Sequence, residues 1–250
     1  MTGKATRLYP LPPREIPAGK IYENLELPSP GSHDLSRPYV IVNMVASIDG
    51  KTAVFGKSSQ IGSRTDRQTM RNLRSKADAV MIGAGTLRSE RLSLGLDEAP
   101  LGPQPLAVIA TNTGDAPLER NLIVAEGQEV LVITTQHART NLGDQLGERG
   151  RVFRMAATPS GDVDLREALK ILKTDHAVDV LLVEGGPALN HALISCNLAD
   201  EFFLTVAPKL LGGTAAEART TLDGTPLESR TASLLSIHHA AGELFIRYGL

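Results

Sequence analysis

The chain has 250 residues, of which 42% are hydrophobic and 22% charged, and its formal net charge is −2. This is the composition of a soluble globular protein. The sequence has no apolar run as long as a membrane span and no basic patch that suggests nucleic acid, which excludes both as expected partners. It also has no leader pattern, so we expect a cytoplasmic protein.

The cysteine and histidine content limits the chemistry of any site. Cys196 is the single cysteine, so the sequence predicts no internal disulfide and no cysteine-based zinc site, and Cys196 itself is expected to be a small buried residue. The six histidines show no metal-ligand spacing. We therefore expect no bound metal.

Residues 1–38 are rich in proline and have few periodic apolar positions. Proline at this density prevents helices and central strands. The sequence therefore predicts an extended N-terminal arm over residues 1–38 and one folded domain over residues 39–250.

The folded domain is predicted to begin with an apolar strand at residues 39–47, in which β-branched residues are frequent. Asn43 lies in the middle of this strand, and is either a satisfied polar group of the core or an amide directed at a ligand. Asp49 follows the strand in an Asp-Gly pair. It has the same two interpretations, because Asp-Gly is also ordinary turn chemistry.

A helix is predicted after Ser63, which can cap its first turn, with Asp66 three residues later in the position of a capping box. Arg67, Arg71 and Arg74 lie on one face of this helix or beside it. They are either solvated surface residues or a group that holds an anionic substrate.

Two predicted strands, at residues 79–82 and 178–183, each run into a glycine-rich turn followed by a helix. Paired small residues let the backbone approach a ligand, and amides at a helix N-terminus attract phosphate. The alternative is a pair of tight turns without a ligand. If a dinucleotide binds, its pyrophosphate would bridge the two turns. The residues of the turns are Gly83, Gly85, Thr86, Glu184, Gly185, Gly186 and Pro187.

Further strands are predicted at residues 105–110, 130–134 and 151–156, and an amphipathic helix at residues 164–176. Thr111 follows the first of these strands, where α/β folds often bind ribose or a 2′-phosphate. The alternation predicts a mostly parallel sheet flanked by helices. Residues 233–249 predict an antiparallel C-terminal hairpin instead.

Four stretches together resemble one known family, the reductase domain of the riboflavin pathway. They are RPYVIVNMVASIDGKTA, NLRSKADAVMIGAGT, LLVEGGPALNHALI and LADEFFLTVAPKLLGG. The resemblance implies an α/β fold of the dihydrofolate-reductase-like type, a homodimer, and NADPH as cofactor. It also implies reduction, by hydride transfer to the ribose C1′, of a diaminopyrimidine ribotide or of 5-amino-6-(5-phosphoribosylamino)uracil.

The resemblance also implies roles for individual residues. It implies substrate contacts at Asn43, Ser58, Arg74 and Glu184. Glu90, Asp49 and Glu184 are the candidate acids that steer the proton. The residues expected to bind the cofactor, from the resemblance and the turn analysis together, are Ala46, Gly83, Gly85, Thr86, Glu90, Thr111, Gly185, Gly186, Pro187, Ala188 and Leu189.

The chain departs from the family pattern in three places. Residues 1–37 hold neither the HxE nor the PCxxC motif of the zinc deaminase found in bifunctional relatives, so a stand-alone reductase is expected. Glu90-Arg91-Leu92 replaces the acidic pair and proline of the family, and the position of the basic residue expected a few residues later falls near Asp97. These changes leave two alternatives open: a reductase of dihydrofolate or another pterin-like ring, and a non-catalytic nucleotide-binding module.

Overall fold

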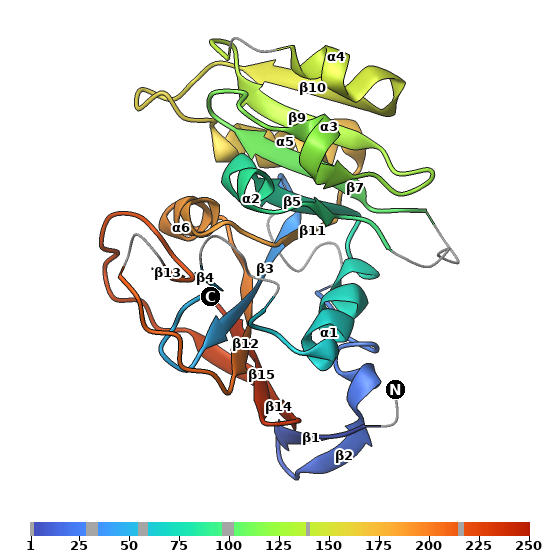
Figure 1. The fold of residues 1–250 in the computed structure, drawn as a ribbon, viewed down its shortest axis with the longest axis vertical. Helices are drawn as coiled ribbons and strands as arrows, with labels where there is room; N and C mark the ends of the chain where they lie inside the picture. The colour runs from blue at the N-terminus through green and yellow to red at the C-terminus, as the bar shows by residue number, and fades with distance from the viewer. Residues whose placement is uncertain (1–2, 29–34, 55–59, 97–102, 139–140, 215–217) are drawn as a thin grey trace.

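The computed structural model describes residues 3–28, 35–54, 60–96, 103–138, 141–214 and 218–250, and its main feature is one sheet of 11 strands (Figure 1). The strand order is β10-β9-β7-β5-β11-β3-β12-β15-β14-β1-β2. Two short pairs, β4 (Ala53–Val54) with β13 (Ala218–Arg219) and β6 (Leu92–Ser93) with β8 (Leu122–Ile123), lie outside this sheet. The strands of the main sheet are β1 (Lys4–Tyr9), β2 (Arg14–Pro17), β3 (Tyr39–Ser47), β5 (Ala79–Gly83), β7 (Leu106–Thr111), β9 (Val130–Thr135), β10 (Gly150–Met155), β11 (Val180–Val183), β12 (Glu201–Ala207), β14 (Ser233–Ala240) and β15 (Glu243–Gly249).

The sheet is parallel from β10 to β12 and antiparallel from β12 to β2. β14 and β15 form a hairpin whose turn residues, Ala241 and Gly242, both have positive φ, at 53° and 83°. Such a turn matches the twist of the paired strands. The predicted fold class, a mostly parallel sheet with an antiparallel C-terminal hairpin, is confirmed.

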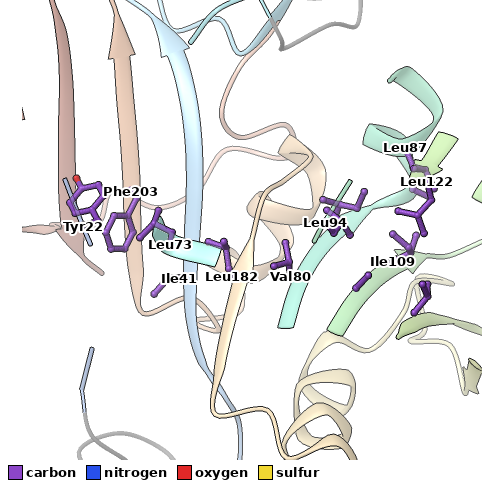
Figure 2. Close-up of a cluster of buried hydrophobic side chains, with 14 of the residues drawn as sticks. Tyr22, Ile41, Leu73, Val80, Leu87, Leu94, Ile109, Leu122, Leu182 and Phe203 are labelled. Atoms are coloured by element: carbon purple, nitrogen blue, oxygen red, sulfur yellow. The ribbon is translucent and has the colours of Figure 1, made fainter. Parts of the chain in front are cut away.

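Helices pack on both faces of the sheet. The helices are α1 (Arg64–Arg74), α2 (Ala84–Ser89), α3 (Leu118–Asn121), α4 (Leu142–Leu146), α5 (Leu165–His176) and α6 (Pro187–Ser195), with the short 3₁₀ turns η1 (Ala18–Lys20) and η2 (Gly147–Arg149). Leu73 of α1 and Leu87 of α2 belong to the core cluster of one face, together with buried residues of β3, β5, β7, β11 and β12 (Figure 2). Leu169 of α5 and Leu193 of α6 belong to the cluster of the other face. Because side chains alternate along a strand, each central strand contributes to both clusters.

The described part of the N-terminal segment adds two strands to the main sheet and forms a short 3₁₀ turn. β1 pairs antiparallel with β14, and β2 forms the edge of the sheet (Figure 1). Ala5, Ala18 and Ile21 are buried in the core. The prolines remain compatible with these strands because β2 is an edge strand, where a missing N–H breaks no ladder. The proposed division of the chain at residue 38 stays a prediction.

The start of α1 differs in one detail from the predicted capping box. Ser63 caps the helix as expected, since its hydroxyl accepts hydrogen bonds from the amides of Thr65 and Asp66. The amide of Ser63 donates to Glu243 of β15, at 2.9 Å, so the reciprocal bond comes from a residue 180 positions away. The carboxylate of Asp66 is therefore not needed for the cap.

Candidate active site

The two predicted glycine turns lie side by side at the carboxyl ends of β5 and β11. The amide of Gly83 donates to the carbonyl of Gly185, at 2.8 Å. Gly185 has a φ of +90°, which favours glycine, and a Cβ on Gly186 would lie 2.9 Å from Oγ1 of Thr86. The two backbones can therefore come together with no side chain between them.

These turns border a cavity of about 850 Å³ between α2, α6 and the start of α5. The volume is within the range of small-molecule binding sites. It brings together ten of the residues that the sequence analysis selected: Gly83, Gly85, Thr86, Glu90, Thr111, Glu184, Gly186, Pro187, Ala188 and Leu189. Gly185 lies behind this surface and contributes its carbonyl to the turn contact.

The N-terminus of α6 forms one wall of the cavity. Pro187 is the first helical residue, and the amides of Ala188 and Leu189 lie in the first turn, where no acceptor exists inside the helix. Residues 221–223 are held against this wall, because the backbone amide of Asp223 donates to the carbonyl of Pro187 at 3.2 Å and the side-chain amide of Asn190 donates to that of Thr221 at 3.1 Å. The positive end of the helix dipole thus faces the cavity, as anion binding requires.

Hydroxyl and carboxylate groups line the far end of the cavity, beyond β7. The side chain of Asn112 donates to Asp162 and accepts from the amide of Val163, at 2.9 Å. Ser160 also donates to Asp162, at 2.6 Å. Thr111 accepts from the amide of Gly114. These bonds fix the loop after β10 to the loop after β7 and give the cavity a polar rim.

Glu184 is fixed in place by a bidentate ion pair with Arg74 of α1. Nε and Nη2 of Arg74 each donate to one carboxylate oxygen at 2.7 Å, and Nη1 donates to the carbonyl of Gly95 at 2.8 Å. The two side chains are 6% and 11% exposed. Since every nitrogen of the guanidinium already has an acceptor in the protein, the geometry favours a role in positioning Glu184. The expected contact of Arg74 with substrate phosphate stays a prediction.

Two further predicted site residues, Ala46 and Asp49, are not part of the cavity lining. Ala46 is buried in β3. The carboxylate of Asp49 accepts from the hydroxyl of Ser47 and the amides of Leu211 and Gly212. These hydrogen bonds lower the pKa of Asp49 to about 2, and the bond from the hydroxyl of Ser47 has the largest effect. Asp49 therefore joins two loops of the described structure. Ser58 and Asp97 lie outside the described residues.

Asn43 lies next to Glu184 in the sheet. Val183 of β11 is in register with Val42 of β3, so the following residues of the two strands are neighbours. The side-chain amide of Asn43 has no hydrogen-bond partner among the described residues, and the residue is partly exposed. A polar group of this kind beside a fixed carboxylate is suited to binding a ligand.

Residues 38–242 match the model of one protein family, described as the RibD C-terminal domain. The chain belongs to this family. Among its relatives is the 2,5-diamino-6-ribosylamino-4(3H)-pyrimidinone 5′-phosphate reductase of Methanothermobacter thermautotrophicus, with 30% identity over 192 residues that cover 75% of this chain and 85% of the relative. The reductase of the same name from Archaeoglobus fulgidus is 30% identical over 198 residues, covering 75% and 87% of the two chains.

Solved structures of the RibD C-terminal domain type have the same fold. Acinetobacter baumannii RibD aligns with a TM-score of 0.69 and 25% identity, covering 86% of this chain and 58% of that chain. The riboflavin biosynthesis reductase Rib7 of Saccharomyces cerevisiae aligns with a TM-score of 0.64 and 16% identity, covering 88% and 92%. The dihydrofolate-reductase-like fold expected from the sequence is thus confirmed, and as a member of a family of riboflavin-pathway reductases the chain is an oxidoreductase.

Two features of this RibD C-terminal domain were missed or misjudged from the sequence. Cys196 is exposed and lines the cavity, whereas a buried residue was expected. Asp66, interpreted only as a capping residue, is turned toward the sheet and contacts Thr205 of β12. The sequence holds no local signal for either position, because both depend on which distant segments pack beside them.

The described part of the chain holds neither a membrane-spanning helix nor a cluster of metal ligands. None of its helices has the length and apolar character needed to cross a bilayer. Within the same residues, no three His, Cys, Asp or Glu side chains are grouped so as to hold a metal ion.

Proposed function

We propose that this protein reduces the ribosylamino group of a pyrimidine 5′-phosphate of riboflavin biosynthesis, with NADPH as the reductant. The observation that carries the proposal is the pair of glycine turns joined by the Gly83–Gly185 hydrogen bond at the edge of the large cavity. Family membership and the names of the relatives support the substrate class.

The residues at the cavity fit a dinucleotide. Gly83 and Gly186 line the cavity, and a Cβ at Gly186 would lie 2.9 Å from Oγ1 of Thr86. The first turn of α6 offers free amides for a pyrophosphate. Thr111 and its neighbours offer hydroxyl groups for the adenosine ribose. When bound, NADPH supplies the hydride, and the protein supplies alignment.

The substrate is proposed to bind on the side of Glu184 and Asn43. Glu184 already serves as the acceptor for Arg74, so we assign it to orienting N–H or O–H groups of the substrate. Glu90 lies at the cavity wall and is our choice for delivering the proton. Asp49 is not assigned a chemical role, because its carboxylate binds the loop at Leu211 and Gly212.

A homodimer in the cytoplasm is part of the proposal. Apolar side chains of β12 and β15 remain partly exposed on the face opposite Phe203 and Phe245: Phe202, Leu204, Val206, Leu244, Ile246 and Tyr248. A contiguous apolar face of this kind is typical of a subunit interface. Sedimentation of the wild-type protein and of Leu204→Glu tests it, since the variant should shift toward monomer.

The function is tested by mixing purified protein with NADPH and one candidate substrate at a time, and by following the absorbance of the reduced nicotinamide. We expect turnover with a pyrimidine ribotide, and deuterium from labelled NADPH at C1′ of the product. Turnover with dihydrofolate alone would replace the proposal by the pterin alternative. Tight NADPH binding without turnover of any substrate would favour the non-catalytic module.

A further inference from the structure

A carboxyl group on the α1 side of the sheet has no role in the proposed mechanism. Asp66 lies in the first turn of α1 and is partly exposed. Its side chain folds back over Gly62, where a Cβ would stand 2.0 Å from Oδ2, and the hydroxyl of Thr205 contacts the carboxylate. Asp66 is therefore held between its helix and the sheet.

Asp66 shares a face of the sheet with the proposed substrate side. Phe203, Ile41 and Leu182 belong to the core cluster that Leu73 of α1 joins (Figure 2). Two residues further along β12 and β3, Thr205 and Asn43 point to the same face, and Glu184, just after β11, meets Arg74 of α1 there. Asp66, which contacts Thr205, thus lies on the face of the sheet that carries Asn43 and Glu184.

Negative charge dominates the surroundings of Asp66. The charged groups that act on it are Glu243 from β15, Glu184 from the end of β11 and Arg67 from its own helix. Burial, aided by the two glutamates, raises the pKa of Asp66 to about 6. Arg74 neutralises Glu184, its ion-pair partner, which leaves Glu243 as the buried carboxylate near Asp66 without a cation partner among the described residues. Such surroundings favour a ligand rich in N–H donors.

The two pyrimidines expected as substrates differ at one edge of the ring. A 2,5-diaminopyrimidinone carries a 2-amino group beside N3–H, so two donors point the same way and match the two oxygens of a carboxylate. A uracil carries a carbonyl oxygen at C2, which a carboxylate repels.

We propose that Asp66 binds the 2-amino and N3–H groups of a 2,5-diaminopyrimidinone ribotide and thereby selects this substrate over the uracil ribotide. The inference rests on the proposed function and adds to it the identity of the ring. It makes Asp66 a specificity-determining residue.

The test compares kcat/KM for the two ribotides in the wild type and in Asp66→Asn. We expect the wild type to favour the diaminopyrimidinone by at least about tenfold, since a site built for hydrogen bonds rejects a mismatched partner strongly. An amide offers one donor and one acceptor, as the uracil edge requires. Asp66→Asn should therefore lower the preference at least about tenfold. Calorimetric binding of each ribotide without NADPH should show the same order.

Glu167→Gln is the control, because Glu167 is an exposed carboxylate of α5, which packs on the other face of the sheet. It should affect both ribotides equally. A second readout is pH. Binding of the diaminopyrimidinone by the wild type should strengthen as pH rises through about 6, when Asp66 ionises. Asp66→Asn should lack this part of the profile, although the substrate phosphate titrates in both proteins.

The outcomes separate the two proposals. Reduction of neither ribotide by the wild type would overturn the proposed function, and the inference with it. Equal kcat/KM of the wild type for the two ribotides would overturn the inference alone, even if Asp66→Asn does not fold. An unchanged preference in a folded Asp66→Asn variant would have the same meaning.

Discussion

The two sides of the candidate site present different chemical groups. The α6 side consists of glycine backbone, helix amides and hydroxyl groups, such as Gly83, Gly186 and Thr111. The α1 side consists of charged side chains: Arg74, Glu184 and Asp66. The first kind of surface suits a cofactor shared by many enzymes, because backbone groups bind phosphate without regard to the rest of the ligand. The second kind can distinguish one ring from another.

The largest effect is expected from removing the cation of the α1 side. Arg74→Ala leaves Glu184 buried without its partner, which should cost about 3–5 kcal/mol in the free energy of unfolding. Urea denaturation measures the loss. Arg74→Ala combined with Glu184→Gln should recover part of it, because the orphaned charge is gone. An Arg74→Ala midpoint equal to that of the wild type would show that the pair does not hold the α1 side together.

The next effect is a pH dependence of stability that comes from Asp66. Its pKa is raised in the folded protein to about 6, so the unfolded chain releases its proton first as pH rises. Folding stability should therefore fall as pH rises from about 4 to 6 and stay lower above that range. Relative to Asp66→Asn, the wild type should lose on the order of 2 kcal/mol between pH 4.5 and 7.5. A difference between the two proteins that is independent of pH would contradict the burial of this carboxyl.

Gly186→Ala tests the α6 side. The added methyl group would stand 2.9 Å from Oγ1 of Thr86 and intrude on the cavity wall. We expect binding of NADPH to weaken about tenfold or more, which corresponds to about 1.4 kcal/mol. Gly143→Ala is the control, because nothing lies within 4 Å of the added group. Equal affinity of both variants for NADPH would show that the glycine turn is not part of the cofactor site.

Asp49→Ala should have the smallest effect. It removes the bonds to Leu211 and Gly212 from an exposed carboxylate, so only a small drop in thermal midpoint is expected at pH 7. The pKa of Asp49 is lowered to about 2, so this contribution should vanish as pH falls toward that value. A loss of turnover greater than about a hundredfold without a stability change would return Asp49 to the list of catalytic acids.

The same contrast explains which parts of the site the sequence could predict. The glycine turns are local signals, since strand, small residues and helix follow one another along the chain, and a parallel sheet places them at one edge. The ion pair of Arg74 with Glu184 joins residues 110 positions apart, and no local pattern links them. Asp66 was misjudged because Glu243, 180 positions from Ser63, supplies the bond that a capping box would have supplied.

The fold was predictable for a similar reason, with one exception. Apolar runs such as residues 39–47 and 180–183 mark buried parallel strands by their composition alone. The hairpin of β1 and β2 has no such signal, because its strands mix charged, polar and apolar residues and β2 ends in proline. It is recognised as part of the sheet only through its pairing with β14.

The position of β3 has a consequence for how the protein is made. β3 ends at Ser47, yet its neighbours in the sheet, β11 and β12, begin at Val180 and Glu201. On the ribosome, an apolar strand therefore emerges more than a hundred residues before either partner is translated. Pairings of such long sequence separation close slowly. We expect the nascent chain to depend on chaperones that shield this strand until the last third of the polypeptide has been synthesised.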